Sequence, residues 1–369
     1  MIGQKTMPSM DISRGGVEVV VEELAPRLVS LGQNVTCLNR KGCYNGNRKE
    51  YKGVRLIDVP CIRKRGLSAA TSSILASFRA AFGKYDIVHY HAEGTCVFLW
   101  LPKLMRKRCI VTIHGIDWQR DKWKSGFGSR YIRLGEKTAV RYADEIIVLS
   151  HNAEKYFLDS YGRKTVYIPN GVPTPTRRNP EIIQEKFGLE KEEYILFLGR
   201  LVPEKGLEIL IRAFRKLKTD RKLVIAGYAS DTDEFVEHLE EMARGDERIR
   251  FVGFVQGKPL EELYSNAYFY VLPSFLEGMP ISLLEAMSYG NCCLASDIPE
   301  CSEAAGEHAV YFHCGDEKEL MQVMQRLLDD PSEVRYYREG AADYILSRYN
   351  WDSVAEKTLA LYRESEGCK

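Results

Sequence analysis

The sequence lacks the glycine-rich fingerprints of two common nucleotide-binding classes. Neither GxGxxG nor GxxxxGK[ST] occurs in its 369 residues, so dinucleotide and P-loop chemistry are not indicated. Its 10 cysteines include no CxxC pair and no Cys/His cluster at zinc-finger spacing. We therefore expect neither a disulfide framework nor a metal site, and a reducing compartment fits this cysteine usage.

Long apolar runs are also missing. The most apolar stretch, residues 97–105, is interrupted by Pro102 and Lys103, and the opening MIGQKTMPS has no basic segment followed by an apolar core. Neither a spanning helix nor a signal peptide is predicted. We expect a cytoplasmic protein.

The length and composition are those of an ordinary globular protein of about two domains. Of its residues, 45% are hydrophobic and 28% are charged, which excludes disordered, collagenous and coiled-coil classes. Two domains of this size predict a cleft between them.

The net charge of +1 hides an opposite bias in the two halves. Residues 1–172 carry 28 Lys and Arg against 15 Asp and Glu, and residues 173–369 carry 24 against 36. The basic half favours an anionic partner such as a membrane surface, a lipid phosphate or a nucleic acid, although a merely soluble basic surface would look the same.

Short β-branched or aromatic runs alternate with amphipathic stretches along the whole chain, which is typical of parallel sheets covered by helices. The fold class predicted is α/β, with two doubly wound halves. Apolar helical stripes are expected over residues 15–31 and 69–82. The expected strands are Asn34–Asn39, Val54–Val59, Tyr85–Tyr90, Cys109–Ile113, Glu145–Leu149, Thr165–Ile168, Tyr194–Leu198, Lys222–Ala226, Arg250–Val252, Tyr268–Leu272, Cys292–Ala295 and Ala309–Phe312.

A proline-rich segment, residues 169–180, separates the two halves. We predict domains of residues 1–172 and 173–349, followed by an amphipathic helix over residues 350–369. Only Met1 and Ile2 precede Gly3, so the first strand of the first domain is expected to be truncated.

Two carboxylates, Glu277 and Glu285, stand eight residues apart around a predicted loop-to-helix junction. Gly278 permits a ligand to approach the backbone, and Pro280 suits the first turn of a helix whose free N–H groups attract an oxyanion. Ionised carboxylates here would bind sugar hydroxyls. Taken alone, such a pair is more often a capping Glu and a solvated surface Glu, and only the surrounding motifs favour a binding role here.

Two cations follow the predicted strand at residues 194–198. Arg200 comes directly after Gly199, and Lys205 precedes Gly206 at the start of an amphipathic helix. Ligands of open α/β sheets bind at the carboxyl ends of strands, so these cations predict a diphosphate site.

The first half offers weaker candidates. Gly16 belongs to a glycine pair before a strong helix, which favours a loop whose amides face a ligand. His114 and Asp117 follow one predicted strand, and His89 and His91 end another. Histidines in such places are often structural.

Taken together, these segments resemble the retaining GT-B glycosyltransferases of glycosyltransferase family 4 over nearly the whole chain. The resemblance rests on Glu277-x7-Glu285 with LLEAM and ASDIPE, and on GRLVPEKG, GGVE, HG, IPNGV and the closing YNW with ALYRE. It implies two Rossmann-like domains facing across a deep cleft, with a final helix that packs back on the N-terminal domain. The N-terminal domain would bind the acceptor and the C-terminal domain the nucleotide-diphospho-sugar.

The resemblance also implies roles for individual residues. Arg200 and Lys205 would neutralise the diphosphate, Glu285 would hold the ribose, and Glu277 would meet the donor sugar. Gly16 would donate its N–H to the distal phosphate, and His114 would contact the sugar. The remaining implied positions are Gly199, Gly278, Met279 and Pro280 on the donor side, and His91, Asp117 and Trp118 on the acceptor side.

The implied reaction is metal-independent and uses no cofactor besides the nucleotide-sugar donor. Fixed cations beside the leaving diphosphate lower the barrier, and we expect transfer on the same face of the sugar, with the leaving phosphate taking the acceptor's proton.

HGIDWQRDKW and the opening segment resemble members that build cell-surface polysaccharides such as capsule or lipopolysaccharide, including rhamnosyltransferase-like proteins. The acceptor would be a glycan or a sugar on an isoprenoid diphosphate. Basic segments at residues 62–66, 104–109 and 118–133, the last with Trp118 and Trp123, are expected to rest on the inner face of the plasma membrane, so that high salt abolishes the contact.

Other functions remain open at this point. They are an inverting GT-B transferase, a nucleotide-sugar epimerase and a non-catalytic nucleotide-sugar-binding protein. No nucleic-acid partner is expected, because the cations are scattered and no aromatic-rich RNA motif occurs.

Overall fold

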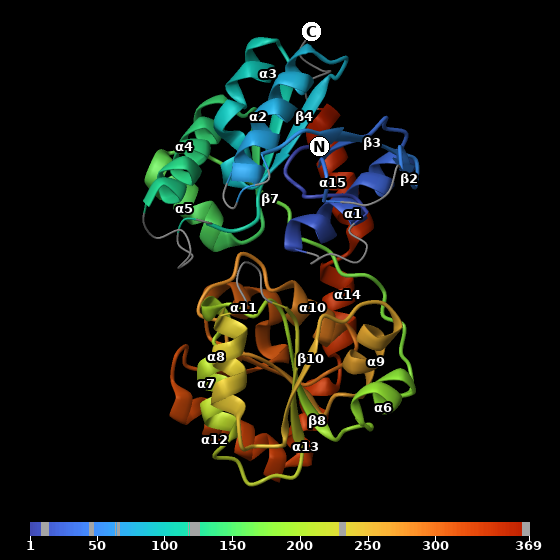
Figure 1. Cartoon of the computed structure of the whole chain (residues 1–369), viewed down its shortest axis with the longest axis vertical. Coiled ribbons are helices and arrows are strands. Elements are labelled where there is room, and N and C mark those ends of the chain that lie inside the picture. Colours follow the sequence, from blue (N-terminus) through green and yellow to red (C-terminus); the bar gives the residue numbers. More distant parts are fainter. Residues whose placement is uncertain are drawn as a thin grey trace. The chain divides into compact units, whose positions relative to one another are not determined.

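The protein is described by a computed structural model, in which the chain forms two compact units (Figure 1). One unit comprises Met1–Gly171 with Trp351–Lys369, and the other comprises Val172–Asn350. The residues that the structure describes are 1–8, 15–43, 48–62, 64, 67–116, 118, 126–228 and 234–363.

The first unit alternates strands and helices. Its elements are α1 (Gly16–Ser30), β1 (Thr36–Arg40), β2 (Glu50–Tyr51), β3 (Val54–Val59), α2 (Leu67–Phe82), β4 (Ile87–His91), the 3-10 helix η1 (Glu93–Phe98), α3 (Trp100–Leu104), β5 (Arg108–Ile113), α4 (Gly126–Tyr142), β6 (Glu145–Val148), α5 (His151–Tyr161), β7 (Val166–Tyr167) and α15 (Trp351–Arg363).

Ile2 lies between two groups of strands in this unit. Ile2 bridges Leu38 of β1 and Tyr90 of β4 in parallel, and so joins the three strands β1-β3-β2 to the four strands β4-β5-β6-β7. The Ile2 N–H donates to the His89 carbonyl at 2.9 Å, and the His91 N–H donates to the Ile2 carbonyl at 2.8 Å. Met1 and Ile2 thus occupy the position of a central strand between β1 and β4.

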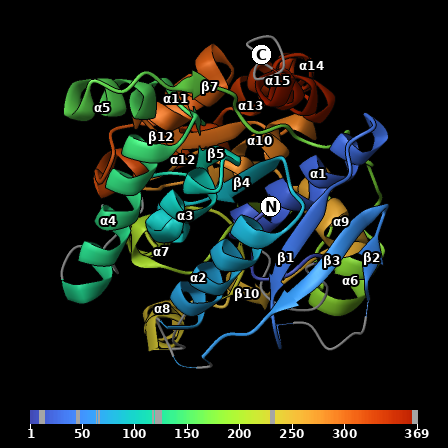
Figure 2. The ribbon, with the colours of Figure 1, turned by 90° about the horizontal axis from the view of Figure 1, so that it is seen from above.

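Side chains from the central strands alternate between two apolar layers. Ile110 and Ile147 pack with α1 and α15, whereas Val111 and Val148 pack with α2, α4 and α5. This alternation is the period of two that a strand imposes, and it lets helices cover both faces of the sheet (Figure 2). The final helix α15 therefore belongs to the first unit.

The second unit is a second α/β body. Its elements are α6 (Ile182–Phe187), β8 (Tyr194–Leu198), η4 (Pro203–Lys205), α7 (Leu207–Phe214), β9 (Lys222–Ala226), α8 (Glu234–Ala243), β10 (Ile249–Gly253), α9 (Lys258–Asn266), β11 (Phe269–Leu272), α10 (Ile281–Ser288), β12 (Cys293–Ser296), α11 (Pro299–Ala305), η5 (Gly306–His308), β13 (Val310–Phe312), α12 (Glu317–Asp329), α13 (Pro331–Arg338) and α14 (Ala341–Arg348).

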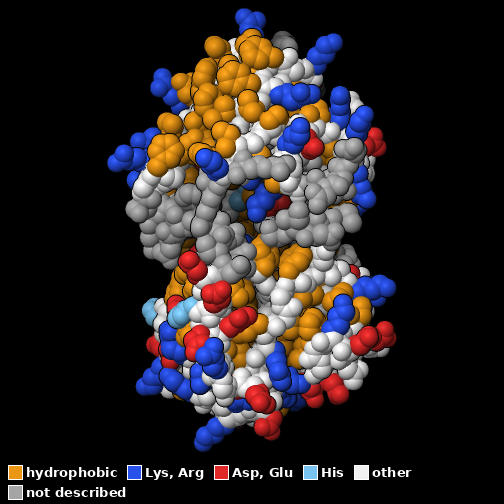
Figure 3. All heavy atoms as spheres, viewed as in Figure 1, with side chains coloured by type: hydrophobic (Ala, Val, Ile, Leu, Met, Phe, Trp, Pro, Cys, Tyr) orange, Lys and Arg blue, Asp and Glu red, His pale blue; other side chains and the backbone are white. Residues whose placement is uncertain are grey.

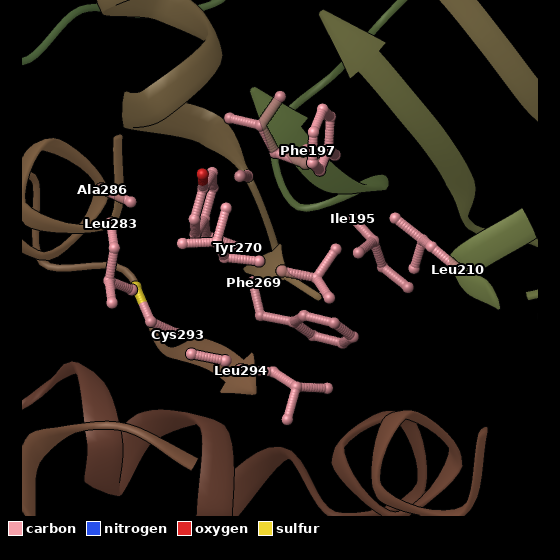
Figure 4. Close-up of a cluster of buried hydrophobic side chains, with 14 of the residues drawn as sticks. Ile195, Phe197, Leu210, Phe269, Tyr270, Leu283, Ala286, Cys293 and Leu294 are labelled. Carbon is pink, nitrogen blue, oxygen red and sulfur yellow. The ribbon is translucent and has the colours of Figure 1, made fainter. Parts of the chain in front are cut away.

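Its sheet is parallel throughout, with the strand order β10-β9-β8-β11-β12-β13. The central strands are buried on both faces, as in the cluster around Ile195, Phe197, Phe269 and Leu294 (Figure 4). Near-continuous apolar runs are what strands covered on both sides require. Both units are therefore Rossmann-like, as the alternating pattern predicts.

Every strand expected from the sequence is present, with ends displaced by at most two residues. The antiparallel strand β2 was not expected; it is short, half exposed and pairs with β3. Within the described residues, no helix combines the length and apolar character that a membrane-crossing segment requires.

Candidate functional site

The order of strands in the second unit reverses direction between β8 and β11. The chain runs from β8 outward to β9 and β10, then returns past β8 to β11 and continues to β12 and β13. Such a reversal leaves a crevice at the carboxyl ends of the two central strands, where ligands of open α/β sheets bind. The segments that follow β8 and β11 carry Arg200, Lys205 and Glu277.

Close backbone contacts hold these two loops together. Gly206 has φ +68°, and a Cβ there would lie 2.0 Å from the Pro273 carbonyl oxygen, so no larger residue fits. The Phe275 N–H donates to the Glu204 carbonyl at 2.8 Å. The turn after β8 is thereby fixed against the turn after β11.

Lys205 and Glu277 form a buried ion pair at this edge of the sheet. Lys205 Nζ lies 2.5 Å from Glu277 Oε1, and the two side chains are 11% and 7% exposed. The Ser274 hydroxyl donates to the same oxygen at 2.7 Å. The pair is held in a partly desolvated place, where an ammonium interacts strongly with an incoming anion.

Arg200 lies on the same loop and also faces a carboxylate. Its Nη2 is 3.9 Å from Glu204 Oε1, and the Arg200 side chain is 31% exposed. Both predicted cations are therefore balanced by acids of this unit. An ammonium and a guanidinium each have several N–H donors, so both cations could also bind the oxygens of a diphosphate.

A hydrogen bond from Tyr264 orients the Glu285 carboxylate. The buried Tyr264 hydroxyl donates to Glu285 Oε2 at 3.0 Å. Burial, strengthened by the Glu285 carboxylate, raises the pKa of Tyr264 well above its usual range, so the phenol remains a donor. A half-buried carboxylate held in this way is preorganised to accept hydroxyl hydrogen bonds.

The helix α10 begins one residue later than the sequence suggests. Pro280 is its N-cap residue, with φ −80° and ψ 74°, and not a member of its first turn. The Ile281 N–H donates to the Met279 carbonyl at 2.9 Å, because the chain turns tightly before the helix. Gly278 and Met279 lie in this turn, between Glu277 and the helix.

Some residues of this site escaped the sequence analysis. Ser274, Tyr264 and Glu204 each contact a predicted site residue. Ser274 had a usable signal, since it stands two residues after a buried strand at the carboxyl edge of the sheet. No sequence signal pointed to Tyr264, because its hydrogen bond to Glu285 depends on how α9 packs against α10.

The first unit gathers its predicted histidines at the carboxyl ends of β4 and β5. His91 Nδ1 lies 3.1 Å from His114 Nε2, and the rings of His89 and His91 stack with centroids 4.4 Å apart. His89 in turn contacts the Tyr362 hydroxyl at 2.7 Å and Thr112 Oγ1 at 2.8 Å. One ring of the His91–His114 pair must offer an N–H and the other a lone pair.

The buried imidazoles of His89 and His91 have lowered pKa values. Burial is the main cause that lowers the pKa of His89 to about 3, and burial with the neighbouring histidines lowers the pKa of His91. The unfolded chain therefore takes up protons from about pH 6.5 downward that the folded unit refuses, and folding stability falls as the pH drops from 6.5 toward 3.

Replacing His89 by Gln should flatten this pH dependence. One buried histidine contributes a slope of about 1.4 kcal/mol per pH unit below its unfolded pKa. Thermal unfolding of the unsubstituted protein and of His89→Gln at pH values from about 7.5 to about 5 measures how the free energy of unfolding changes with pH. The lower limit lies roughly 1.5 units below the unfolded histidine pKa. Equal slopes would contradict the assignment of His89 as a neutral buried ring.

Gly16 is the first residue of α1, with Gly15 as N-cap residue. A Cβ on Gly15 would lie 2.4 Å from Glu18 Oε2, and the buried Glu18 accepts the Lys5 N–H at 2.8 Å. Gly15 thus packs closely against the Glu18 carboxylate. The part of the loop before it, residues 9–14, lies outside the described residues.

Trp118 is turned toward its own unit. Its indole N–H donates to the buried Glu136 at 3.1 Å, and the Arg133 guanidinium lies 4.2 Å from its ring centroid. Tyr156 and Tyr161 donate to the other oxygen of Glu136. Asp117, predicted on the acceptor side, lies outside the described residues.

The structure thus places Gly199, Arg200, Lys205, Glu277 and Glu285 in one unit. It places Gly16, His91, His114 and Trp118 in the other. Gly199, Arg200, Lys205, Glu277, His91 and His114 lie at or just beyond the carboxyl ends of strands, whereas Glu285 lies on α10, Trp118 packs against α4 and Gly16 begins α1.

Comparison with family models divides the chain in the same manner. Residues 14–175 match the model described as Glycosyltransferase Family 4, and residues 179–344 match the model described as Glycosyl transferases group 1.

Several named proteins are similar to this chain. The chain is 26% identical to the uncharacterized glycosyltransferase MJ1607 of Methanocaldococcus jannaschii, covering 95% of this chain and 94% of that protein. It is also 26% identical to the alpha-maltose-1-phosphate synthase of Mycolicibacterium smegmatis, covering 95% of each. The O-antigen chain mannosyltransferase B of Escherichia coli is 26% identical over 59% of this chain and 57% of that protein.

Solved structures share the fold. The sucrose-phosphate synthase of Thermosynechococcus elongatus superposes with a TM-score of 0.82 at 23% identity, over 96% of this chain and 94% of that one. Anabaena Alr3699/HepE in complex with UDP-glucose superposes with a TM-score of 0.79 at 18% identity, over 95% of this chain and 97% of that one.

Proposed function

Because the chain belongs to the GT-B glycosyltransferases of the family 4 and group 1 type, we propose that it moves a sugar with retention from a nucleotide-diphospho-sugar to a glycan or lipid-linked acceptor. The observation that carries the donor half of this proposal is the Lys205–Glu277 pair in the crevice between β8 and β11. It joins a cation suited to a diphosphate with a carboxylate suited to sugar hydroxyls.

Arg200 and Lys205 carry the electrostatic part of the reaction. The bond between the anomeric carbon and the diphosphate oxygen breaks, and negative charge grows on the leaving diphosphate. Fixed cations beside those oxygens stabilise the transition state without any reorganisation. We propose that they take the place of a metal ion, and activity in the presence of excess EDTA should equal activity without it.

Retention is supported by the state of Glu277. Its Oε1 accepts from both the Lys205 ammonium and the Ser274 hydroxyl, and these bonds lower its nucleophilicity. We therefore propose front-face transfer, in which the acceptor oxygen bonds to the anomeric carbon and its proton passes to the departing diphosphate oxygen. His114 would contact the sugar near that carbon.

The acceptor class is proposed from the relatives. The similarity to an O-antigen chain mannosyltransferase supports a growing surface polysaccharide, and the UDP-glucose complex of a structural neighbour supports a nucleotide-sugar donor.

A thermal-shift screen of nucleoside diphosphates and their sugars tests the donor assignment. A ligand at one hundred times its dissociation constant stabilises the folded state by about 2.7 kcal/mol. With the donor known, the anomeric configuration of the product follows from NMR. An inverted product would overturn retention, interconverted donor sugars would indicate an epimerase, and binding without turnover of any acceptor would indicate a binding protein.

A further inference from the structure

Helix α2 is amphipathic in an unusual sense, because its small residues face inward and its large apolar residues face outward. Its buried positions are Ser72, Ser73, Ala76, Ser77, Ala80 and Ala81. Leu75, Phe78 and Phe82, spaced along one side, are 45%, 43% and 71% exposed. The helix expected over residues 69–82 is present, and its small residues rather than its largest apolar residues form the core contact.

The outward apolar residues continue onto the neighbouring elements η1 and α3. The Phe78 and Phe98 ring centroids lie 6.1 Å apart, and those of Phe98 and Trp100 lie 6.0 Å apart. Leu104 at the end of α3 is 70% exposed, and Met105 after it is 42% exposed.

We call the set Leu75, Phe78, Phe82, Trp100, Leu104 and Met105 the apolar face. Figure 3 shows hydrophobic side chains gathered on this unit, with Lys and Arg side chains at their margin. Single exposed apolar residues are ordinary, whereas a contiguous exposed patch marks an interaction site.

Most of the charges beside the apolar face are positive, and the exposed Asp86 after α2 is an acid among them. Exposed cations on α2, α4 and the turn after α3 are Arg79, Arg106, Arg130, Arg133, Lys137 and Arg141. On the described residues of α2, η1, α3 and α4, the acids are Glu93 and Glu136, and both are buried. Lys103 is paired with Asp144, at 2.5 Å.

We propose that the apolar face and the cations beside it form a docking surface for a bilayer that contains anionic lipids. Aromatic and aliphatic side chains enter the boundary between headgroups and acyl chains, while Arg and Lys bind the phosphates. A second copy of this chain is a poor occupant, because a two-fold contact through this face would bring like charges together.

This surface includes part of two segments expected from the sequence, namely Leu104, Met105 and Arg106 of residues 104–109 and Arg130 and Arg133 of residues 118–133. Trp118 is held inward by Glu136, and Trp123 and residues 63, 65 and 66 lie outside the described residues. The proposal rests on the first unit alone, so it stands or falls independently of the donor site.

Vesicle sedimentation of the full chain tests the proposal. Phosphatidylcholine vesicles with about one-third phosphatidylglycerol should bind the protein, pure phosphatidylcholine vesicles should bind it at least about tenfold more weakly, and high salt should weaken the binding. Absence of binding to the anionic vesicles, or equal binding to both, would overturn it.

Variants separate the apolar and the charged contributions. Phe82→Ser with Leu104→Ser should weaken anionic vesicle binding by at least about tenfold, and Arg106→Glu with Lys137→Glu by at least about 25-fold, since each cation near such a surface is worth about fivefold.

Matched controls use exposed residues elsewhere. Leu158→Ser with Tyr336→Ser, which are 52% and 70% exposed, should leave binding within about twofold. The same holds for Lys318→Glu with Arg335→Glu, two exposed cations of the second unit. Because all substituted side chains are exposed, thermal unfolding should be unchanged. If both face variants still bound vesicles, the docking surface would be refuted. It would also be refuted if vesicles never bound the protein and the face variants abolished self-association, because the apolar face would then be a protein–protein contact.

Discussion

The variant Lys205→Ala should lose the stabilisation that a nucleoside diphosphate gives the protein, and its kcat/KM should fall roughly 10²–10³-fold. The ammonium is 11% exposed and is held by Glu277 at the carboxyl edge of β8, so water cannot replace it at the leaving diphosphate. The measurements are the ligand-dependent shift in unfolding temperature and steady-state kinetics.

The same substitution also leaves the Glu277 carboxylate buried without its counter-ion. Breaking a buried pair in this way costs about 3–5 kcal/mol of stability. The ligand-dependent shift is therefore compared with the variant's own ligand-free unfolding temperature. Lys216→Ala, which removes a 60% exposed ammonium from the same unit, should keep the full shift. A full shift in Lys205→Ala would eliminate Lys205 as a diphosphate ligand.

Glu277→Gln is expected to reduce turnover by about 10²-fold or more, while the affinity for a nucleoside diphosphate stays the same or rises. The amide keeps the shape of the side chain and an acceptor for the Ser274 hydroxyl, yet removes the negative charge that neutralises Lys205. The freed ammonium then meets the diphosphate at full charge, but the sugar loses its charged hydrogen-bond acceptor.

Titration calorimetry with a nucleoside diphosphate, beside kcat and KM, separates these two effects. Glu193→Gln is the control, because it removes a 47% exposed carboxylate that pairs with Lys222 at the opposite end of β8. If turnover by Glu277→Gln matched that of the control, Glu277 would have no part in sugar transfer.

The strands were predictable because parallel strands buried on both faces consist of short runs of apolar residues, which can be recognised in the sequence. Runs such as Tyr194–Leu198 and Lys222–Ala226 carry apolar residues at nearly every position, and the structure has strands with those bounds. The strand β2 contains no such run, since two half-exposed residues have no periodicity to detect.

The candidate site was predictable in its residue types but not in its pairings. Strand-end placement of Arg200, Lys205 and Glu277 followed from motif order, whereas the contact of Lys205 with Glu277, 72 residues apart, depends on β8 lying beside β11. Sheet order is a property of the whole fold, and no local pattern specifies it.

Helix α2 shows a different limit. A helical period tells which residues share a side, but not whether that side meets the sheet or the solvent. Here the close approach of α2 to its sheet selects Ala and Ser for contact, so hydrophobicity alone assigns the wrong side.

The return of α15 to the first unit means that this unit is assembled from both extremities of the chain. Trp351, Leu359 and Leu361 complete an apolar layer begun by Val20 and Leu24 on α1. During ribosomal synthesis, residues 172–350 can finish folding before α15, the last helix of the first unit, has been made. If the chain were cut after residue 171, we would expect the C-terminal fragment to fold by itself and the N-terminal fragment to expose the apolar layer that α15 covers.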